Sequence, residues 1–159
     1  MPEPNHADKW APTPEVGAML QGAGVTALVA QSPERSLVSG DLAAFARHCD
    51  LPTLRLARDR ALVLGSTGLG AGWHDEGFAL SDLSAGLALV QLTGPGLADL
   101  VAKATTADLS DIGPSKAITF AGIAVVLGGT GDALDLHVER GLLAYLWSWT
   151  AAALREPSA

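Results

Sequence analysis

The chain has 159 residues, of which 48% are hydrophobic and 17% are charged, and its formal net charge is −7. This length fits one domain with one core, and the excess of acidic residues disfavours nucleic acid as a partner because the chain would repel a phosphate backbone. So few charges leave apolar surface that another protein could cover, although many Ala and Gly residues raise the hydrophobic fraction without creating large patches.

A single cysteine, Cys49, excludes an internal disulfide and a cluster of thiolates for zinc or iron–sulfur binding. We expect this cysteine to pack in the core, as in a protein of the reducing cytosol. The sequence contains no uncharged apolar run of about 18 residues and no basic start followed by an apolar stretch. These observations predict a cytoplasmic protein with neither a membrane span nor a signal peptide.

Residues 1–20 are predicted to form a flexible, Pro-rich arm, and residues 21–156 a single domain. The prolines and polar residues of the arm bury too little surface to offset the entropy lost on ordering. Trp10 is the exception. A large ring in such an arm often marks a docking segment, and either a partner or the chain's own domain could receive it.

The first part of the domain is predicted to form strands and one short helix. Ser32-Pro33-Glu34 resembles a helix start, with a hydroxyl cap before a proline. A better helix is expected over 42–49, with Asp41 as its N-cap. Strands are expected over 25–30, 53–57 and 61–64, and the last two form a hairpin. The glycine-rich stretch 65–72 lacks the Lys-Ser or Lys-Thr of a phosphate-binding loop, and we interpret it as a linker or lid.

The second part alternates strands and helices. The expected elements, in order, are a strand over 86–92, a helix from Pro95 through Ala104, a β-rich run over 117–127 with either a bend or a hairpin near Ala121-Gly122, a strand over 134–138, and a helix from about 139 that ends before Pro157. In the strand over 134–138, apolar and polar residues alternate, which predicts one wet face. His137 falls on that face, and we expect it at the surface.

The last helix carries three aromatic residues, Tyr145, Trp147 and Trp149. Such rings are enriched at the centres of protein interfaces. Helix geometry places Trp149 about 200 degrees around the helix from Trp147. We therefore assign Trp147 to the core, and Trp149 and Tyr145, together with Trp10, to a partner interface.

Several short motifs between residues 76 and 154 occur in an order that resembles the folate-binding module of the glycine-cleavage T protein and of heterotetrameric sarcosine oxidases. The length of the chain and its C-terminal motif resemble the small gamma subunits of those oxidases. The motifs are Asp82-Leu83-Ser84, Leu92-Thr93-Gly94-Pro95, Thr105-Thr106-Ala107-Asp108-Leu109, the segment 132–140, and Tyr145-Leu146-Trp147. The resemblance implies an α+β fold, with helices packed on one side of a mainly antiparallel sheet.

The chain departs from the catalytic members of this group at one position. Those members carry an acidic residue a few positions after the glycine of the second hairpin, whereas here Gly122 is followed by five apolar residues, 123–127. No carboxylate is available there for acid–base or charge-stabilising work. We therefore predict no catalytic and no cofactor-binding residue in this chain.

Metal binding is also not expected. Only His74-Asp75-Glu76 places an imidazole beside carboxylates, and adjacent side chains point apart in regular structure, so a metal would need an irregular loop and further ligands. We predict a polar loop at this position.

The resemblance implies a noncatalytic gamma-like subunit of a flavin-dependent complex that oxidatively demethylates an N-methyl amino acid in one-carbon metabolism. FAD, FMN, NAD and tetrahydrofolate would then belong to the larger flavoprotein subunits. Two alternatives stay open: a free-standing, truncated folate-binding protein that completes a pocket as a homodimer, and a scaffold that kept the fold without the complex.

Overall fold

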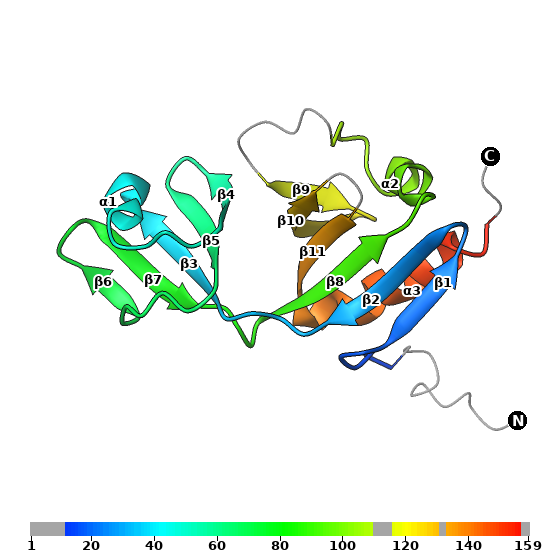
Figure 1. Cartoon of the computed structure of the whole chain (residues 1–159), viewed down its shortest axis with the longest axis horizontal. Helices are drawn as coiled ribbons and strands as arrows, with labels where there is room; N and C mark the ends of the chain where they lie inside the picture. The colour runs from blue at the N-terminus through cyan, green and yellow to red at the C-terminus, as the bar shows by residue number, and fades with distance from the viewer. Residues whose placement is uncertain (1–11, 110–115, 131–132, 157–159) are drawn as a thin grey trace, which may run out of the picture.

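Two antiparallel β-sheets lie side by side in the computed structural model, which describes residues 12–109, 116–130 and 133–156. Figure 1 shows the six-stranded sheet on the right and the five-stranded sheet on the left. The α+β fold expected from the sequence is confirmed, with two sheets in place of one.

The six-stranded sheet combines strands from both ends of the domain. Its strands, in spatial order, are β1 (Met19–Gly22), β2 (Val25–Ala30), β8 (Leu87–Thr93), β11 (Ala133–Glu139), β10 (Ile123–Thr130) and β9 (Ala117–Phe120). All neighbouring strands are antiparallel. Strand pairing reaches into the expected N-terminal arm, because the amide of Gly17 donates to the carbonyl of Val29 and β1 begins at Met19.

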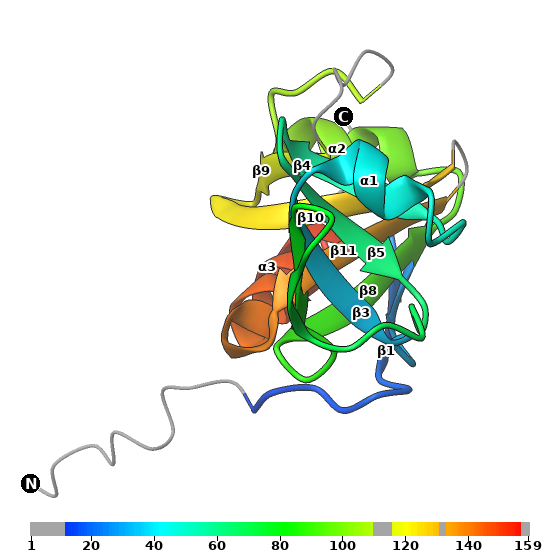
Figure 2. The ribbon, with the colours of Figure 1, turned by 90° about the vertical axis from the view of Figure 1, so that its left-hand side faces the viewer.

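The five-stranded sheet is built from the continuous stretch 35–82. Its strands, in spatial order, are β4 (Thr53–Ala57), β5 (Arg60–Leu64), β3 (Arg35–Gly40), β7 (Phe78–Asp82) and β6 (Gly72–His74). Figure 2 looks onto this sheet and shows the short helix α1 (Leu42–Ala46) at one end of β3 and β5. The predicted cap is confirmed, since a carboxylate oxygen of Asp41 accepts from the amide of Ala44 at 2.9 Å.

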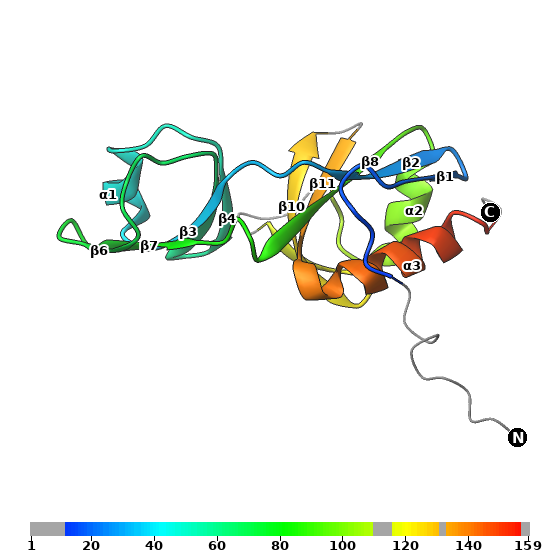
Figure 3. The same ribbon diagram turned by 90° about the horizontal axis from the view of Figure 1, so that it is seen from below.

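The larger hydrophobic core lies between the six-stranded sheet and the helices α2 (Leu97–Ala104) and α3 (Leu143–Ala153). A 3₁₀ turn, η2 (Arg140–Leu142), leads into α3. Figure 3 shows both helices below the β1, β2 and β8 part of the sheet. Alternate residues of the strands supply the buried face, because successive side chains of a strand point to opposite sides; they include Val25, Ala27, Val29, Ala88, Val90, Leu92, Leu134, Leu136 and Val138.

The hairpin, one of the two alternatives predicted near Ala121-Gly122, is confirmed. Ala121 and Gly122 have φ angles of 51° and 82°, and two consecutive positive angles are the signature of the tight turns that join twisted antiparallel strands. This turn sets the register of β9 against β10, with Ile123 opposite Phe120.

The helix predicted to start at Ser32-Pro33-Glu34 is wrong. The chain enters β3 at Arg35, and β3 is the central strand of its sheet, paired with β5 on one side and β7 on the other. Hydrogen bonding along both edges of this segment outweighs a local capping signal, because propensity is a weak prior against tertiary contacts.

None of the helices in the described ranges has the length and apolar character needed to span a bilayer.

Candidate functional site

A buried arginine joins the two sheets. Arg35, the first residue of β3, is fully buried, and its guanidinium donates to the carbonyls of Ser84, Leu87 and Ala88. It also lies 3.2 Å from Nδ1 of His137 on β11. The backbone of Arg35 is held as well, since its amide donates to the hydroxyl of Ser84 at 2.9 Å. The side chain from the five-stranded sheet is thus held by acceptors at the start of β8 and on β11.

The predicted surface position of His137 is wrong: only 2% of this residue is exposed. It lies on the face of β11 that points away from the larger core. The contact between the two sheets, which is centred on Arg35 and which we call the joint, covers that face. Burial, followed by the nearby charge of Arg35, lowers the pKa of His137 to about 4, against a smaller opposing effect of Asp135. At neutral pH the imidazole is therefore uncharged.

Arg35 also fixes the tautomer of His137. A guanidinium can only donate, so the nitrogen facing it, Nδ1, must accept, and the proton of the neutral ring then sits on Nε2. Nε2 has no hydrogen-bond partner among the described residues.

A second contact between the sheets lies beside this imidazole. The amide of Lys116 donates to the carbonyl of Arg55 at 2.6 Å, and Leu54 packs over Gly128. A Cβ at position 128 would stand 3.4 Å from Cδ1 of Leu54 and 3.5 Å from Nε2 of His137. Glycine at this position lets the leucine and the imidazole approach the same point of β10.

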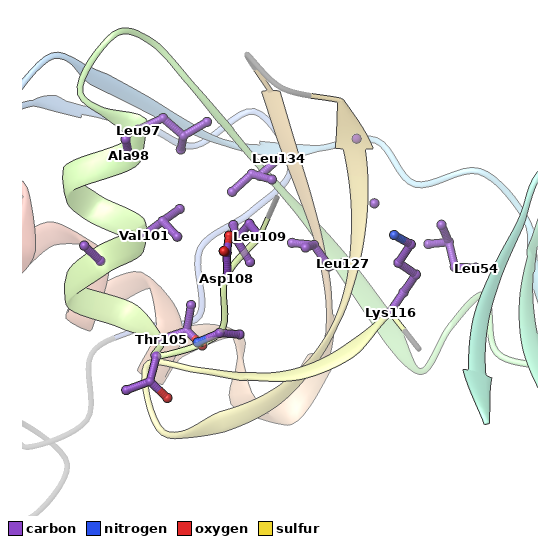
Figure 4. A pocket seen from close by; sticks show the side chains of 15 residues that line it. Leu54, Leu97, Ala98, Val101, Thr105, Asp108, Leu109, Lys116, Leu127 and Leu134 are labelled. Atoms are coloured by element: carbon purple, nitrogen blue, oxygen red, sulfur yellow. The ribbon is translucent and has the colours of Figure 1, made fainter. Parts of the chain in front are cut away.

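A cleft of about 730 Å³ opens between α2, the paired ends of β10 and β11, and the tip of β4. Figure 4 shows the apolar side chains of Leu97, Val101 and Leu134 on one side, and Lys116 beside Leu54 at the other end. The full lining is Leu54, Leu97, Ala98, Val101, Ala102, Thr105, Thr106, Ala107, Asp108, Leu109, Lys116, Leu127, Gly128, Gly129 and Leu134.

Two of the three predicted interface residues share one face of α3. Tyr145 and Trp149 are four residues apart, which places them on neighbouring turns, and we call this pair the α3 surface. Tyr145 is 50% exposed and its hydroxyl donates to the carbonyl of Ala121 at 2.8 Å. Trp149 is partly buried and packs edge-on against Phe120. The third residue, Trp10, lies outside the described residues.

Trp73 was not identified from the sequence. It lies on the edge strand β6, and 70% of it is exposed, more than any other large hydrophobic residue of the described ranges. The available signal was a tryptophan that directly follows the glycine-rich stretch 65–72, where no core position is expected. The next residue, His74, stacks on Phe78 and contacts the carbonyl of Gly70 through Nε2.

The apolar segment that follows Gly122, where the sequence comparison looked for an acidic residue, lies on β10. Residues 123–127 run along this strand without an ionisable side chain. Within the described ranges, no group of three or more His, Cys, Asp or Glu side chains is placed to hold a metal ion.

No protein-family model matches the chain, and no curated protein matches it in sequence. A solved structure does match: a chain of the heterotetrameric sarcosine oxidase from Corynebacterium sp. U-96, determined in complex with pyrrole 2-carboxylate. The two are 24% identical, the TM-score is 0.68, and the match covers 88% of each chain. This likeness shows the fold, and it agrees with the resemblance in the sequence motifs. Since both coverages are equal, the two chains are of about the same length.

Proposed function

We propose that this chain is the noncatalytic small subunit of a heteromeric, flavin-dependent complex that oxidises an N-methyl amino acid such as sarcosine. The observation that carries the proposal is the likeness over 88% of each chain to a component of a heterotetrameric oxidase. The order of the motifs between residues 76 and 154 supports it independently. In this proposal the chain acts in the cytoplasm, and FAD, FMN, NAD and tetrahydrofolate are bound by the larger subunits.

The side chains of β10 support a noncatalytic role. Acid–base work on an amine requires an ionisable group at hydrogen-bond distance from it. Along β10, residues 123–127 offer only apolar side chains at the position where the catalytic relatives carry an acid. The chain therefore contributes contact surface, and the reaction takes place in its partners.

We place the contact with those partners on the α3 surface. Half of Tyr145 remains exposed although its hydroxyl is anchored on Ala121, so the ring is held in one orientation before a partner arrives. An aromatic ring that is already ordered loses little entropy on binding. Trp149 extends this apolar surface toward Phe120.

The test is affinity purification of the tagged full-length chain from its native source, followed by measurement of flavin absorbance in the eluate. Larger flavoprotein subunits in a fixed ratio to the chain are the expected result. A monodisperse monomer recovered without flavoprotein would contradict the proposal. A homodimer that shows no flavin would favour the rival, a truncated folate-binding protein.

The interface is tested with Tyr145→Ala, and Trp73→Ala is the matched control because it removes an exposed aromatic residue from the five-stranded sheet. We expect Tyr145→Ala to lower the yield of complex about tenfold or more, as for a central interface aromatic. The control should retain wild-type yield. The reverse result would place the contact on β6 and not on the α3 surface.

Trp149→Ala and deletion of residues 1–11, which removes Trp10, complete the set. We expect both to weaken assembly more than they lower the melting temperature. An equal loss of both properties would assign these rings to the core.

A further inference from the structure

The cleft beside α2 has the size and walls of a small-molecule site. Its volume of about 730 Å³ lies within the range of roughly 300 to 1,000 Å³ that is usual for such sites. Leu97, Leu127 and Leu134 line it and are themselves buried, while Val101 and Leu109 are partly exposed to it. The walls come from α2, the segment 105–109, the hairpin of β10 and β11, and Leu54 of β4.

One end of the cleft carries a positive charge. The backbone of Lys116 is fixed on both sides, because its amide donates to Arg55 and its carbonyl accepts from Leu127 at 2.8 Å. Figure 4 shows its side chain next to Leu54 at the end of the cleft away from α2. Among residues 12–109, 116–130 and 133–156, no ion pair involves this ammonium.

A second donor lies behind the same end. Nε2 of His137 is buried, carries the proton of the neutral ring and has no partner in the described part of the chain. The point that a Cβ would occupy on Gly128 is 3.5 Å from this nitrogen. Gly128 and Leu54 both line the cleft. His137 itself is not among the lining residues, so a ligand oxygen would reach the Nε2 proton only past Gly128 and with the side chain of Leu54 turned aside.

We propose that this cleft binds a small amphipathic carboxylate, whose apolar body lies along α2 and whose carboxylate meets Lys116 and the Nε2 proton of His137. The charges of the lining favour a single negative charge. Among the described residues Lys116 is the one cation of the lining, and Asp108 lines the cleft as well. A phosphate with two charges would therefore be repelled by Asp108 more strongly than a single carboxylate. The site is separate from the α3 surface and does not depend on the proposed subunit role.

The probes are cis-parinaric acid, a fatty acid that becomes fluorescent in apolar surroundings, and its methyl ester, which has the same chain without the charge. Both are titrated into the full-length protein at neutral pH. The acid is expected to bind about tenfold more tightly than the ester, as for one charge-assisted hydrogen bond. Equal affinities, or no binding of the acid, would overturn the proposal.

Three variants assign the site. Lys116→Gln should remove the preference for the acid over the ester, whereas Lys103→Gln, which changes a lysine outside the cleft that pairs with Glu156, should keep it. Val101→Trp fills the cleft and should abolish binding of both probes. Gly128→Ala puts a methyl group 3.4 Å from Cδ1 of Leu54 and 3.5 Å from Nε2 of His137. This group narrows the approach to Nε2, and the variant should bind the acid several-fold more weakly while its affinity for the ester is unchanged.

Near-ultraviolet circular dichroism of each variant shows whether the fold is retained. A folded Val101→Trp variant that binds the acid with wild-type affinity would place the probe elsewhere and refute the cleft as its site. A folded Lys116→Gln variant that still prefers the acid would refute the role of the lysine.

Discussion

The six-stranded sheet and the five-stranded sheet are held together in different ways. Among the described residues, 20 buried side chains form the core of the former, with contributions from two helices. The core of the latter has seven, and its helix, α1, is only five residues long. An isolated core this small contributes little stability, because the apolar area that it buries barely offsets the entropy lost on ordering. The five-stranded sheet therefore depends on its joint to the larger one.

The joint combines the apolar contact of Leu54 over Gly128 with a buried polar cluster around Arg35. Arg35 brings a buried charge, which desolvation makes unfavourable, and burial together with the charge of Arg140 lowers its pKa. The carbonyls of Ser84, Leu87 and Ala88 compensate this cost by accepting from the guanidinium. The comparison teaches that the larger sheet is stabilised mainly by buried apolar area, whereas the smaller sheet adds a few directional hydrogen bonds to a small core of its own. Such bonds can be broken one at a time.

The largest effect is expected in the larger core. Leu136 is fully buried at the centre of β11, and Leu136→Ala removes its packing and leaves a cavity. We expect a loss of about 3 to 4 kcal/mol in the free energy of unfolding, measured by urea denaturation. A loss below about 1 kcal/mol would show that this core is not the main source of stability.

Breaking the joint should come next. Arg35→Met keeps much of the side-chain volume but leaves buried carbonyls without donors, and we expect a cost of about 2 to 3 kcal/mol. Hydrogen exchange should accelerate in β3, β5 and β7 more than in β8 and β11. Arg60→Met, at an exposed position of β5, is the control and should change stability by less than about 0.5 kcal/mol. Uniform acceleration in both sheets would show that they open as one unit.

Acidification tests the joint without a change at Arg35. The pKa of His137 is about 4 in the folded chain, and about 6.5 is usual for an unfolded chain. As the pH falls, the unfolded state therefore binds the proton first, so this contribution is fully present above about pH 6.5 and is lost on the way to pH 4. We expect a loss of about 2 kcal/mol between pH 8 and pH 5.

His137→Gln isolates this effect from the titration of carboxylates. Glutamine retains an acceptor for Arg35 but does not titrate, so urea curves of the variant should fall less steeply with pH over the same interval. Parallel curves for wild type and variant would mean that His137 titrates normally and is not held by the joint.

The smallest effect concerns the α3 surface. Tyr145→Phe removes one hydrogen bond to Ala121 and leaves the ring in place. Because the residue is half exposed, water replaces the lost partner in part, and we expect a cost of about 0.5 to 1 kcal/mol in thermal or urea denaturation. A much larger cost would show that the β9–β10 turn depends on this tyrosine.

Local patterns were sufficient for most elements of the larger sheet. The strands β8 and β11 and the turn at Ala121-Gly122 were predicted correctly. Each depends on a pattern of neighbouring residues: an apolar run, an apolar–polar alternation and a turn sequence. The strands β4 and β5 and the cap at Asp41 were found in the same way.

The joint could not be predicted, since it depends on contacts between distant residues. Arg35 and His137 are 102 positions apart, and an alternating strand looks the same whether its polar face meets water or a second sheet. Ser32-Pro33-Glu34 misled for a related reason, because the partners that make β3 a strand lie in β5 and β7. The sequence predicted the individual elements that line the cleft, but not that they lie next to one another in the fold.

The pairing of β2 with β8 predicts where homologous chains can differ. β2 and β8 are adjacent and antiparallel, and Ala30 lies opposite Leu89. In topological terms the whole stretch 35–82 is the loop of a single β-hairpin, and its two stems are tied where the amide of Arg35 meets the hydroxyl of Ser84. Such a loop can be lengthened, shortened or exchanged without shifting the register of its host. Homologous chains should therefore diverge most between residues 31 and 86, while the host sheet keeps its strand order.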